Sequence, residues 1–170
     1  MRLPAEITSP RLVLRLITPD EARDMVAGRR RTDWHADYPR QDDRDAASMI
    51  RSTDDAGRPD GWGPRHVVRA FDGLVVGSIG FFGPPDDLGG APETEVGYGL
   101  VDDARGRGVA SEAVRALLQH TDRLGVRVRA SVLPGNAASI RVLATCGFTE
   151  LRGSTEEGEL VMARPLPVIT

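Results

Sequence analysis

The sequence has 170 residues, a formal net charge of −3 and a single cysteine, Cys146. This length predicts one domain spanning residues 1–170, which can bury roughly 70% of its unfolded surface. The net negative charge, the absence of a long apolar run and the lack of a signal peptide argue against nucleic-acid and membrane partners. One cysteine excludes an internal disulfide and fits a cytoplasmic protein.

Hydrophobic periodicity predicts a chain that mixes helices and strands. Leucines alternate with other residues over 11–17, Thr18 and Glu21 form a capping box, and Asp72-Gly73 is a hairpin turn. In chain order we expect a strand over 11–17, a helix over 19–28, an aromatic loop over 34–39, a helix over 42–50, a break over 56–61, strands over 66–71 and 74–82, a long loop over 83–92, a strand over 95–101, a helix over 109–124, a strand over 126–132, a short helix between Asn136 and Gly147, and an antiparallel pair over 148–152 and 159–163. This order predicts an α+β (mixed α/β) fold with one central sheet.

The chain is organised around the strand at 95–101 and the helix at 109–124. Between them lies the sequence Arg-Gly-Arg-Gly, residues 105–108. Glycines allow backbone amides to approach a ligand closely, and a helix N-terminus adds unpaired N–H groups and partial positive charge. Two arginines supply full charge and bidentate donors, so the loop suits a phosphate or pyrophosphate.

Three phosphate-binding motifs compete for this loop. A P-loop needs a lysine, and the sequence contains none. The dinucleotide fingerprint is nearly met by Gly106, Gly108 and Ser111, which leaves a nicotinamide-binding module as an alternative. The third motif, Arg/Gln-x-x-Gly-x-Gly/Ala, is met by Arg105, Gly108 and Ala110. A turn with solvated arginines and no ligand is a further interpretation.

The third motif, after a Glu-Val-Gly-Tyr strand, resembles the acyl-CoA loop of the GNAT superfamily of N-acetyltransferases. Residues 8–15 match the family's opening strand, and residues 134–143 and 146–148 are similar to the Rim-type branch that acetylates the N-termini of ribosomal proteins. The resemblance covers residues 8–163. It implies a GNAT-like fold: a mostly antiparallel, twisted sheet of about seven strands with flanking helices, and splayed strands at the acyl-CoA site.

The resemblance implies acetyl-CoA as cosubstrate, bound by the central strand, the arginine–glycine loop and the short helix. The residues implied in this contact are Val96, Leu100, Val101, Arg105, Gly106, Arg107, Gly108, Val109, Ala110, Asn136 and Ser139. Capping of a helix explains Asn136 equally well. A backbone N–H near residues 96–98 is expected to bind the thioester oxygen as charge develops there.

Glu95 is the first candidate for the general base, because it lies on the central strand close to the expected acyl site. A surface glutamate is the alternative, with Glu93 as the second candidate. Ser139 is the candidate proton donor to the leaving thiolate, or else only a polar residue in the first helical turn. Many GNAT enzymes use a tyrosine after the short helix as the acid, and this sequence has none there.

Aromatic residues in the loops are the candidates for the acceptor site. Trp34, His35, Tyr38 and Trp62 can stack on an amine or make cation–π contacts with it. A packed or solvated histidine is the usual alternative for His35. The three histidines and Cys146 show no metal-ligand spacing, so we expect no metal.

These features predict an N-acetyltransferase that moves an acetyl group directly from acetyl-CoA to a primary amine. The amine partner is a protein N-terminus or a small molecule, and the resemblance is compatible with a homodimer. The alternative from a different class is a regulatory domain that binds acyl-CoA without turnover.

Overall fold

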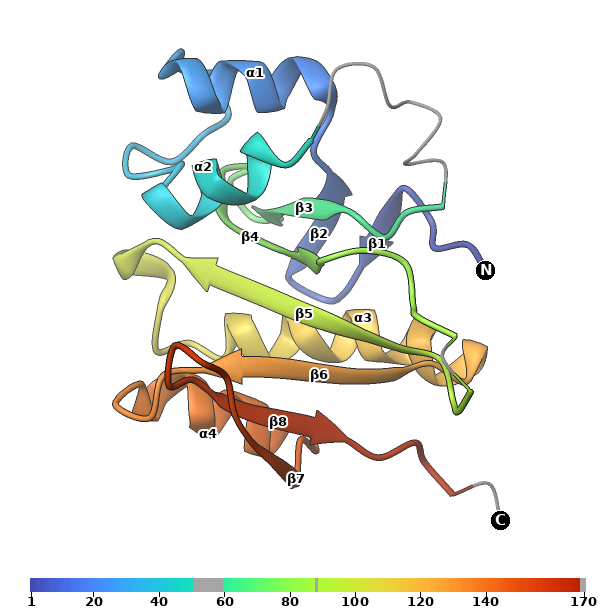
Figure 1. Ribbon diagram of the computed structural model, residues 1–170. Helices are drawn as coiled ribbons and strands as arrows, with labels where there is room; N and C mark the ends of the chain where they lie inside the picture. The colour runs from blue at the N-terminus through green and yellow to red at the C-terminus, as the bar shows by residue number, and fades with distance from the viewer. Residues whose placement is uncertain (51–59, 88, 169–170) are drawn as a thin grey trace.

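The computed structural model describes residues 1–50, 60–87 and 89–168 (Figure 1). Within these residues the chain forms one eight-stranded sheet and four α-helices. The strands are β1 (Glu6–Thr8), β2 (Leu12–Leu16), β3 (Pro64–Arg69), β4 (Val75–Phe81), β5 (Glu93–Leu100), β6 (Arg127–Val132), β7 (Glu150–Ser154) and β8 (Leu160–Arg164). The helices are α1 (Pro19–Ala27), α2 (Gln41–Ser48), α3 (Val109–Leu124) and α4 (Ala137–Thr145), with a short 3₁₀ turn at Asp102–Ala104.

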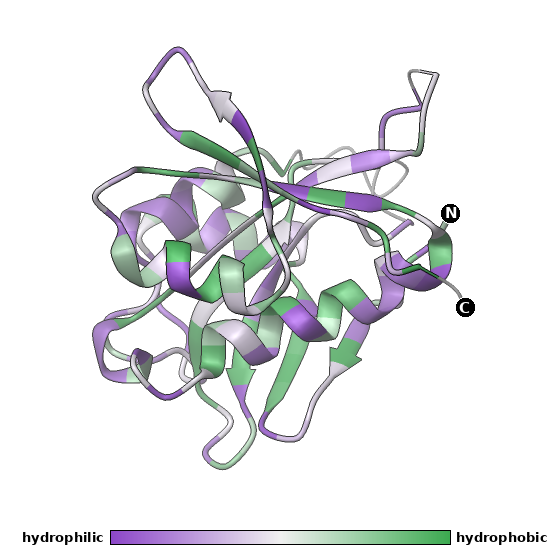
Figure 2. Ribbon diagram, turned by 90° about the horizontal axis from the view of Figure 1, so that it is seen from below, coloured by the Kyte–Doolittle hydropathy of each residue, from purple (hydrophilic) through white to green (hydrophobic). Residues whose placement is uncertain are grey.

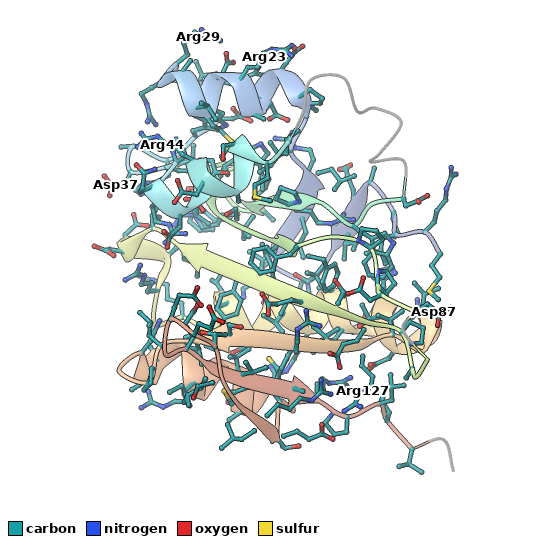
Figure 3. The ribbon with its side chains drawn as sticks, viewed as in Figure 1. Arg23, Arg29, Asp37, Arg44, Asp87 and Arg127 are labelled. Atoms are coloured by element: carbon teal, nitrogen blue, oxygen red, sulfur yellow. The ribbon has the colours of Figure 1, made fainter. Side chains whose placement is uncertain are left out.

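The sheet has the strand order β1-β2-β3-β4-β5-β6-β8-β7. Every neighbouring pair is antiparallel except β5 and β6, which are parallel. In Figure 1, α1 and α2 lie together above the strands β2–β4, whereas α3 lies behind β5 and β6. Arg23 and Arg29 point away from the sheet on the outer side of α1 (Figure 3). The helices therefore cover both faces of a sheet that remains open at its edges.

Alternating side chains fill the core as the sequence predicts. In β6, Val128, Ala130 and Val132 are buried, while the intervening residues are only half-buried. The helices of Figure 2 carry both hydrophobic and hydrophilic residues, as expected of helices with one face on a sheet. In α3 the buried residues include Val109, Ala113 and Leu117, which lie four apart on one face.

The helix ends also follow the sequence signals. Thr18 and Glu21 make both hydrogen bonds of the capping box at the start of α1. At the start of α4, Asn136 Oδ1 accepts a hydrogen bond of 3.1 Å from the Ser139 backbone N–H. Gly125 ends α3 with a φ of 69°, a left-handed conformation that favours glycine. The sequence predicts these helix ends well, because a cap is formed by residues within a few positions of one another.

The differences from the sequence prediction are small. The sheet has eight strands rather than about seven, because β1 was not predicted. Only three residues long, β1 shows too little alternation to be recognised, and its place comes from pairing with β2. Most of the predicted break at 56–61 lies outside the described residues, in which Asp60 and Gly61 form a turn and a bend.

A buried polar chain lies beneath α1 and α2. The Tyr38 hydroxyl is 2.8 Å from His66 Nδ1, and His66 Nε2 is 3.0 Å from Glu21 Oε2. Arg15 Nη1 donates to both Glu21 carboxylate oxygens at 3.0 Å. Burial by itself raises the pKa of Glu21, but the hydrogen bonds from His66, Thr18 and Arg15 and the charge of His66 outweigh burial and hold that pKa well below its usual range.

Replacing Glu21 by glutamine is expected to lower the free energy of unfolding by about 3 kcal/mol at pH 7, because it breaks a buried charged pair. A carboxyl with a lowered folded-state pKa stabilises the protein above its unfolded pKa of about 4.3, and this contribution is lost as the pH falls toward the folded value. Urea denaturation at pH 7, 5 and 3 should therefore show the variant and the parent converging at acid pH. Glu157→Gln, on an exposed turn, is the control. An equal difference at all three pH values would contradict this assignment.

Candidate active site

The two parallel strands at the centre of the sheet separate along their length. β5 and β6 pair only from Glu93–Arg127 to Glu95–Arg129. Beyond these three pairs β6 continues beside β8 as far as Val132, and β5 continues beside β4 as far as Leu100. The strands therefore splay over the second half of β5, where the family resemblance implied an acyl-CoA site.

The backbone of β5 directs polar groups into this splay. Phe82 N–H donates to Glu95 C=O at 3.0 Å, and Val101 N–H donates to Val76 C=O at 2.8 Å. Because hydrogen bonding alternates along an antiparallel strand, the odd-numbered residues of β5 pair with β4. The even-numbered residues Val96, Tyr98 and Leu100 then direct their N–H and C=O groups toward the gap. The Leu100 carbonyl accepts a hydrogen bond of 3.1 Å from Arg105 Nε, which ties the loop to the strand.

The arginine–glycine loop presents the N-terminus of α3 to the end of the splay. Gly106 and Gly108 have φ values of 73° and 75°, in the left-handed region that favours glycine. No side chain caps α3 at this end, and its first intrahelical bond runs from Glu112 N–H to Gly108 C=O. The amides at 109–111 therefore have no intrahelical acceptor and can bind an anion.

Arginines hold the loop in place from outside. Arg11 Nη1 donates to Arg107 C=O at 2.9 Å, and Arg11 Nε pairs with Glu112 Oε1 at 2.7 Å. Arg105 pairs with Asp102 at 3.1 Å. Arg107 has an exposed side chain, so it is available to a bound anion. The loop is thus pre-organised by contacts made through its backbone and flanking side chains.

Glu95 lies where the two strands begin to separate. Its Oε1 accepts a hydrogen bond of 3.0 Å from Ser131 Oγ and lies 3.4 Å from Arg129 Nε. Its side chain is 24% exposed, so it can reach solvent and a bound amine. This geometry is compatible with a general base, although the arginine competes for the carboxylate.

Glu93 is held more tightly than Glu95. Its carboxylate accepts hydrogen bonds of 2.7 Å from Arg152 and 3.0 Å from Arg129. Burial by itself raises the pKa of Glu93, but these two arginines outweigh burial and keep that pKa below its usual range. Glu93 is therefore the poorer of the two candidate bases.

Ser139 has a partner that the sequence did not reveal. The Tyr98 hydroxyl lies 2.8 Å from Ser139 Oγ, which connects β5 with the first turn of α4. Burial raises the pKa of Tyr98 above its usual range, so the phenol stays protonated at neutral pH. The alternation of β5 shows that Tyr98 shares a face with Val96 and Leu100, but only the tertiary fold places α4 over that face.

A cavity of about 560 Å³ lies beside the splay, between α2, the loop before β3, and the ends of β4 and β5. Its lining combines apolar groups, such as Trp62 and Phe82, with Arg40 and the carboxylates of Asp42 and Asp45. The backbone of Gly97 forms part of its floor. The cavity can therefore bring a second substrate to the same stretch of β5.

The structure does not bring the four predicted acceptor residues together. Trp62 lines the cavity, but it is buried, packs on Phe81 with ring centroids 5.2 Å apart, and donates from Nε1 to Met1 C=O. Trp34 and Tyr38 are core residues, only 4% and 0% exposed, which pack edge to face beneath the helices. None of the cavity-lining residues is Trp34, His35 or Tyr38.

His35 is engaged in a different contact. Its Nε2 lies 2.7 Å from Asp103 Oδ2, and its Nδ1 accepts a hydrogen bond from the Asp37 backbone. An aromatic loop sequence does not distinguish a wall of the core from a wall of a pocket. Arg40 and Phe82 line the cavity and were not singled out, since an arginine before a helix and a phenylalanine at a strand end are common.

The described residues show neither a membrane-spanning helix nor a metal-binding cluster. No helix among them has the length and hydrophobicity needed to cross a bilayer. In the same part of the chain, no group of three or more histidine, cysteine, aspartate or glutamate side chains is arranged to hold a metal ion.

Comparison with known proteins identifies the class. A family model described as an acetyltransferase (GNAT) domain matches residues 11–149. No curated protein sequence matches the chain. Among solved structures, a Bordetella pertussis protein described as a GNAT-family acetyltransferase has a TM-score of 0.67 and 24% identity, over 95% of this chain and 100% of that chain.

Two further similar structures are described as ribosomal-protein or Rim-type acetyltransferases. A Vibrio fischeri ribosomal-protein-S5-alanine acetyltransferase has a TM-score of 0.69 and 17% identity, covering 96% of this chain and 97% of that one. Mycobacterium smegmatis RimJ in complex with CoA-disulfide has a TM-score of 0.64 and 21% identity, covering 96% and 89%. At these identities the likeness shows the fold alone.

The fold and the matched domain define an acetyl-CoA-dependent acyltransferase. Since the family model spans most of the sequence, the chain belongs to the GNAT acetyltransferase family.

Proposed function

We propose that this protein transfers an acetyl group from acetyl-CoA directly to a primary amine, which is a protein N-terminal amine or the amine of a small molecule. One observation carries the proposal: the splay of β5 from β6 lies between the uncapped N-terminus of α3 and a cavity that reaches Gly97. A donor and an acceptor can therefore approach one stretch of backbone from two sides.

The donor is expected to bind through its pyrophosphate and its pantetheine arm. The amides at 109–111 and the exposed Arg107 suit the pyrophosphate, because they combine unpaired donors with positive charge. The open backbone groups of Tyr98 and the N–H of Leu100 can hydrogen-bond to the amides of the arm, as a neighbouring strand would. Asn136 and Ser139, at the start of α4, then lie close to the sulfur end.

The reaction needs only proton transfers from the protein. Glu95 takes a proton from the ammonium group, and the freed nitrogen lone pair attacks the thioester carbonyl carbon. A backbone N–H near Val96–Tyr98 stabilises the oxygen as it becomes negative. The C–N bond forms, the C–S bond breaks, and the nitrogen loses its second proton to solvent as the amide forms. The thiolate leaves with the bonding electron pair and takes a proton from Ser139 Oγ as that oxygen is reprotonated from solvent. Glu95 gives its proton to solvent when the product leaves, so the reaction releases one proton overall.

Tyr98 supports this last step as a positioning residue. Its hydroxyl, kept neutral by burial, can donate to Ser139 Oγ and so stabilise the oxygen that gives up the proton. The start of α4 adds partial positive charge near the thiolate. Together these groups replace the tyrosine acid that the family resemblance implied and the sequence lacks.

We expect Ser139→Ala to lower kcat by about 10²-fold, as for loss of a general acid, and Tyr98→Phe to lower it by about 5-fold, as for loss of one hydrogen bond. Because Tyr98 acts through Ser139, the double variant should be no slower than Ser139→Ala alone. Steady-state rates at saturating acetyl-CoA measure all three. If the fold-loss in kcat of the double variant equalled the product of the two single losses, the two hydroxyls would act independently.

Two kinds of amine acceptor are consistent with the site. Similar structures include proteins described as acetyltransferases of ribosomal proteins, which supports a protein N-terminus as one acceptor. The cavity also has room for a small amine. A domain that binds acyl-CoA without turnover remains the competing function, and only a rate can separate the two.

The test measures binding and turnover on the same purified protein. Excess acetyl-CoA should raise the thermal stability, by about 2.7 kcal/mol at a hundredfold excess over its dissociation constant, whereas NAD should not. Release of free CoA thiol on adding amines then reports transfer. Stabilisation without thiol release over a broad panel of peptides and small amines would favour the regulatory domain. No stabilisation by acetyl-CoA would overturn the proposal.

A further inference from the structure

The cavity beside the splay contains one arginine that is fixed in place with part of its guanidinium left open. Arg40 immediately precedes α2 and lines the cavity, with a side chain 23% exposed. Its Nε and Nη2 donate to Asp43 at 3.1 and 2.9 Å, and its backbone N–H donates to the same carboxylate at 2.8 Å. Asp43 is fully buried and also accepts a hydrogen bond from Ser78 Oγ.

The guanidinium lies against the central strand at Gly99. A Cβ atom at Gly99 would come within 2.1 Å of Arg40 Nη2 and within 2.7 Å of both Cζ and Nη1. Only glycine at this position leaves room for the arginine head. Ser78 pairs with Gly99 in the sheet, so the carboxylate, the serine and the glycine together fix one orientation of the arginine.

The remaining nitrogen, Nη1, is not used by Asp43. Among residues 1–50, 60–87 and 89–168, Nη1 of Arg40 makes no hydrogen bond. Gly99 lies two residues after Gly97 on the same strand face, a distance of about 7 Å. Nη1 is therefore held within reach of an oxygen on the acceptor when its amine is at Val96–Tyr98.

We infer that Arg40 is a specificity-determining residue, whose Nη1 donates a hydrogen bond to an oxygen on the group next to the reacting amine. This inference rests on the proposed function. It predicts acceptors with an amine and a carbonyl on the same carbon, which occur in peptide N-termini and in free amino acids. A simple alkylamine offers no such oxygen.

The charge of the cavity distinguishes peptide N-termini from free amino acids. Asp43 neutralises Arg40, and Asp42 and Asp45 add negative charge to the wall of the cavity. A carboxylate next to the amine is repelled by these aspartates, whereas a neutral amide carbonyl is not. The occupant that fits is an α-amino amide, as at the end of a peptide.

The test compares acetylation of L-alaninamide and isopropylamine, which share a skeleton and differ by the amide group, and of L-alanine as the carboxylate. The Arg40→Lys variant keeps a positive charge next to Asp43 but lacks the guanidinium and its Nη1 donor. In the Gly99→Ala variant the new Cβ atom displaces the Arg40 guanidinium, which keeps its positive charge. Each variant should lower kcat/KM for alaninamide about 10- to 100-fold more than for isopropylamine. Taking the ratio of parent to variant for each amine cancels the different pKa values of the amines.

Arg44→Lys is the matched control, because Arg44 lies one turn further along α2 and does not line the cavity (Figure 3). It should leave both ratios unchanged. Per unprotonated amine, the parent should acetylate alaninamide at least tenfold better than alanine, and Asp42→Asn with Asp45→Asn should narrow that difference. Thermal stabilisation by acetyl-CoA confirms that each variant is folded.

Equal losses for alaninamide and isopropylamine, or no loss for either, would overturn the role of Arg40 and leave the proposed function standing. A preference for alanine over alaninamide would overturn the assignment to an amide carbonyl. Failure of the parent protein to acetylate any of the three amines or a peptide, despite binding acetyl-CoA, would instead overturn the proposed function, and this inference with it.

Discussion

Replacing Glu95 by glutamine is expected to lower kcat for amine acetylation by about 10²- to 10⁴-fold, the range usual for loss of a general base. Glutamine keeps the size of the side chain and an acceptor for Ser131 Oγ, so the splay should be preserved. Binding of acetyl-CoA should not change, because the carboxylate lies at the start of the splay, away from the loop at α3. Steady-state rates at saturating acetyl-CoA, measured over a range of pH, give the loss in kcat.

Glu93→Gln is the comparison for this prediction. Glu93 lies two residues earlier, on the same face of β5, but it is held by two arginines. We expect it to lower kcat by less than about tenfold, as for a residue whose role is structural. If Glu93→Gln reduced kcat more than Glu95→Gln, the assignment of the base would be reversed.

Replacing Gly108 by valine should weaken acetyl-CoA binding by about 10- to 100-fold. Gly108 has a φ of 75°, and a β-branched residue in this region costs about 1–3 kcal/mol. Relief of that strain turns the first amides of α3 away from the pyrophosphate. The added Cβ atom also lies 3.5 Å from Nη2 of Arg11, whose Nη1 holds the Arg107 carbonyl of the loop. The dissociation constant, measured by isothermal titration calorimetry, reports the change.

Gly28→Val is a matched control for this prediction. Gly28 ends α1 with the same φ of 75°, and a Cβ atom there would meet nothing within 4 Å. The two variants should therefore lose comparable folding stability, while only Gly108→Val loses affinity for acetyl-CoA. Equal affinities in both variants would show that the loop does not hold the pyrophosphate.

The sequence was sufficient to predict those features that depend on local chemistry. The capping box of Thr18, the N-cap at Asn136 and the alternation of β6 were all predicted and are confirmed by the structure. The family resemblance added the splay of β5 from β6, which alternation alone does not contain. The family model, which matches residues 11–149, confirms the superfamily.

The remaining features depend on tertiary packing. Trp34 and Tyr38 have the composition of a binding loop, yet they pack into the core against His66. The contact between Tyr98 and Ser139 joins residues 41 apart, and the Arg40 guanidinium fits against β5 only because Gly99 has no side chain. No periodic pattern predicts which helix will cover which part of a strand.

The three-pair contact between β5 and β6 also places an exposed strand edge inside the molecule. A free edge on the surface invites pairing with other chains, and natural proteins usually shorten, charge or cover such edges. Here the two edges face each other within one sheet, and α3 lies behind them (Figure 1). A thin, flexible ligand with amide groups can complete the hydrogen bonding between these edges, which are flanked by their own sheet neighbours β4 and β8. The protein therefore keeps the recognition power of an unpaired strand without its tendency to aggregate.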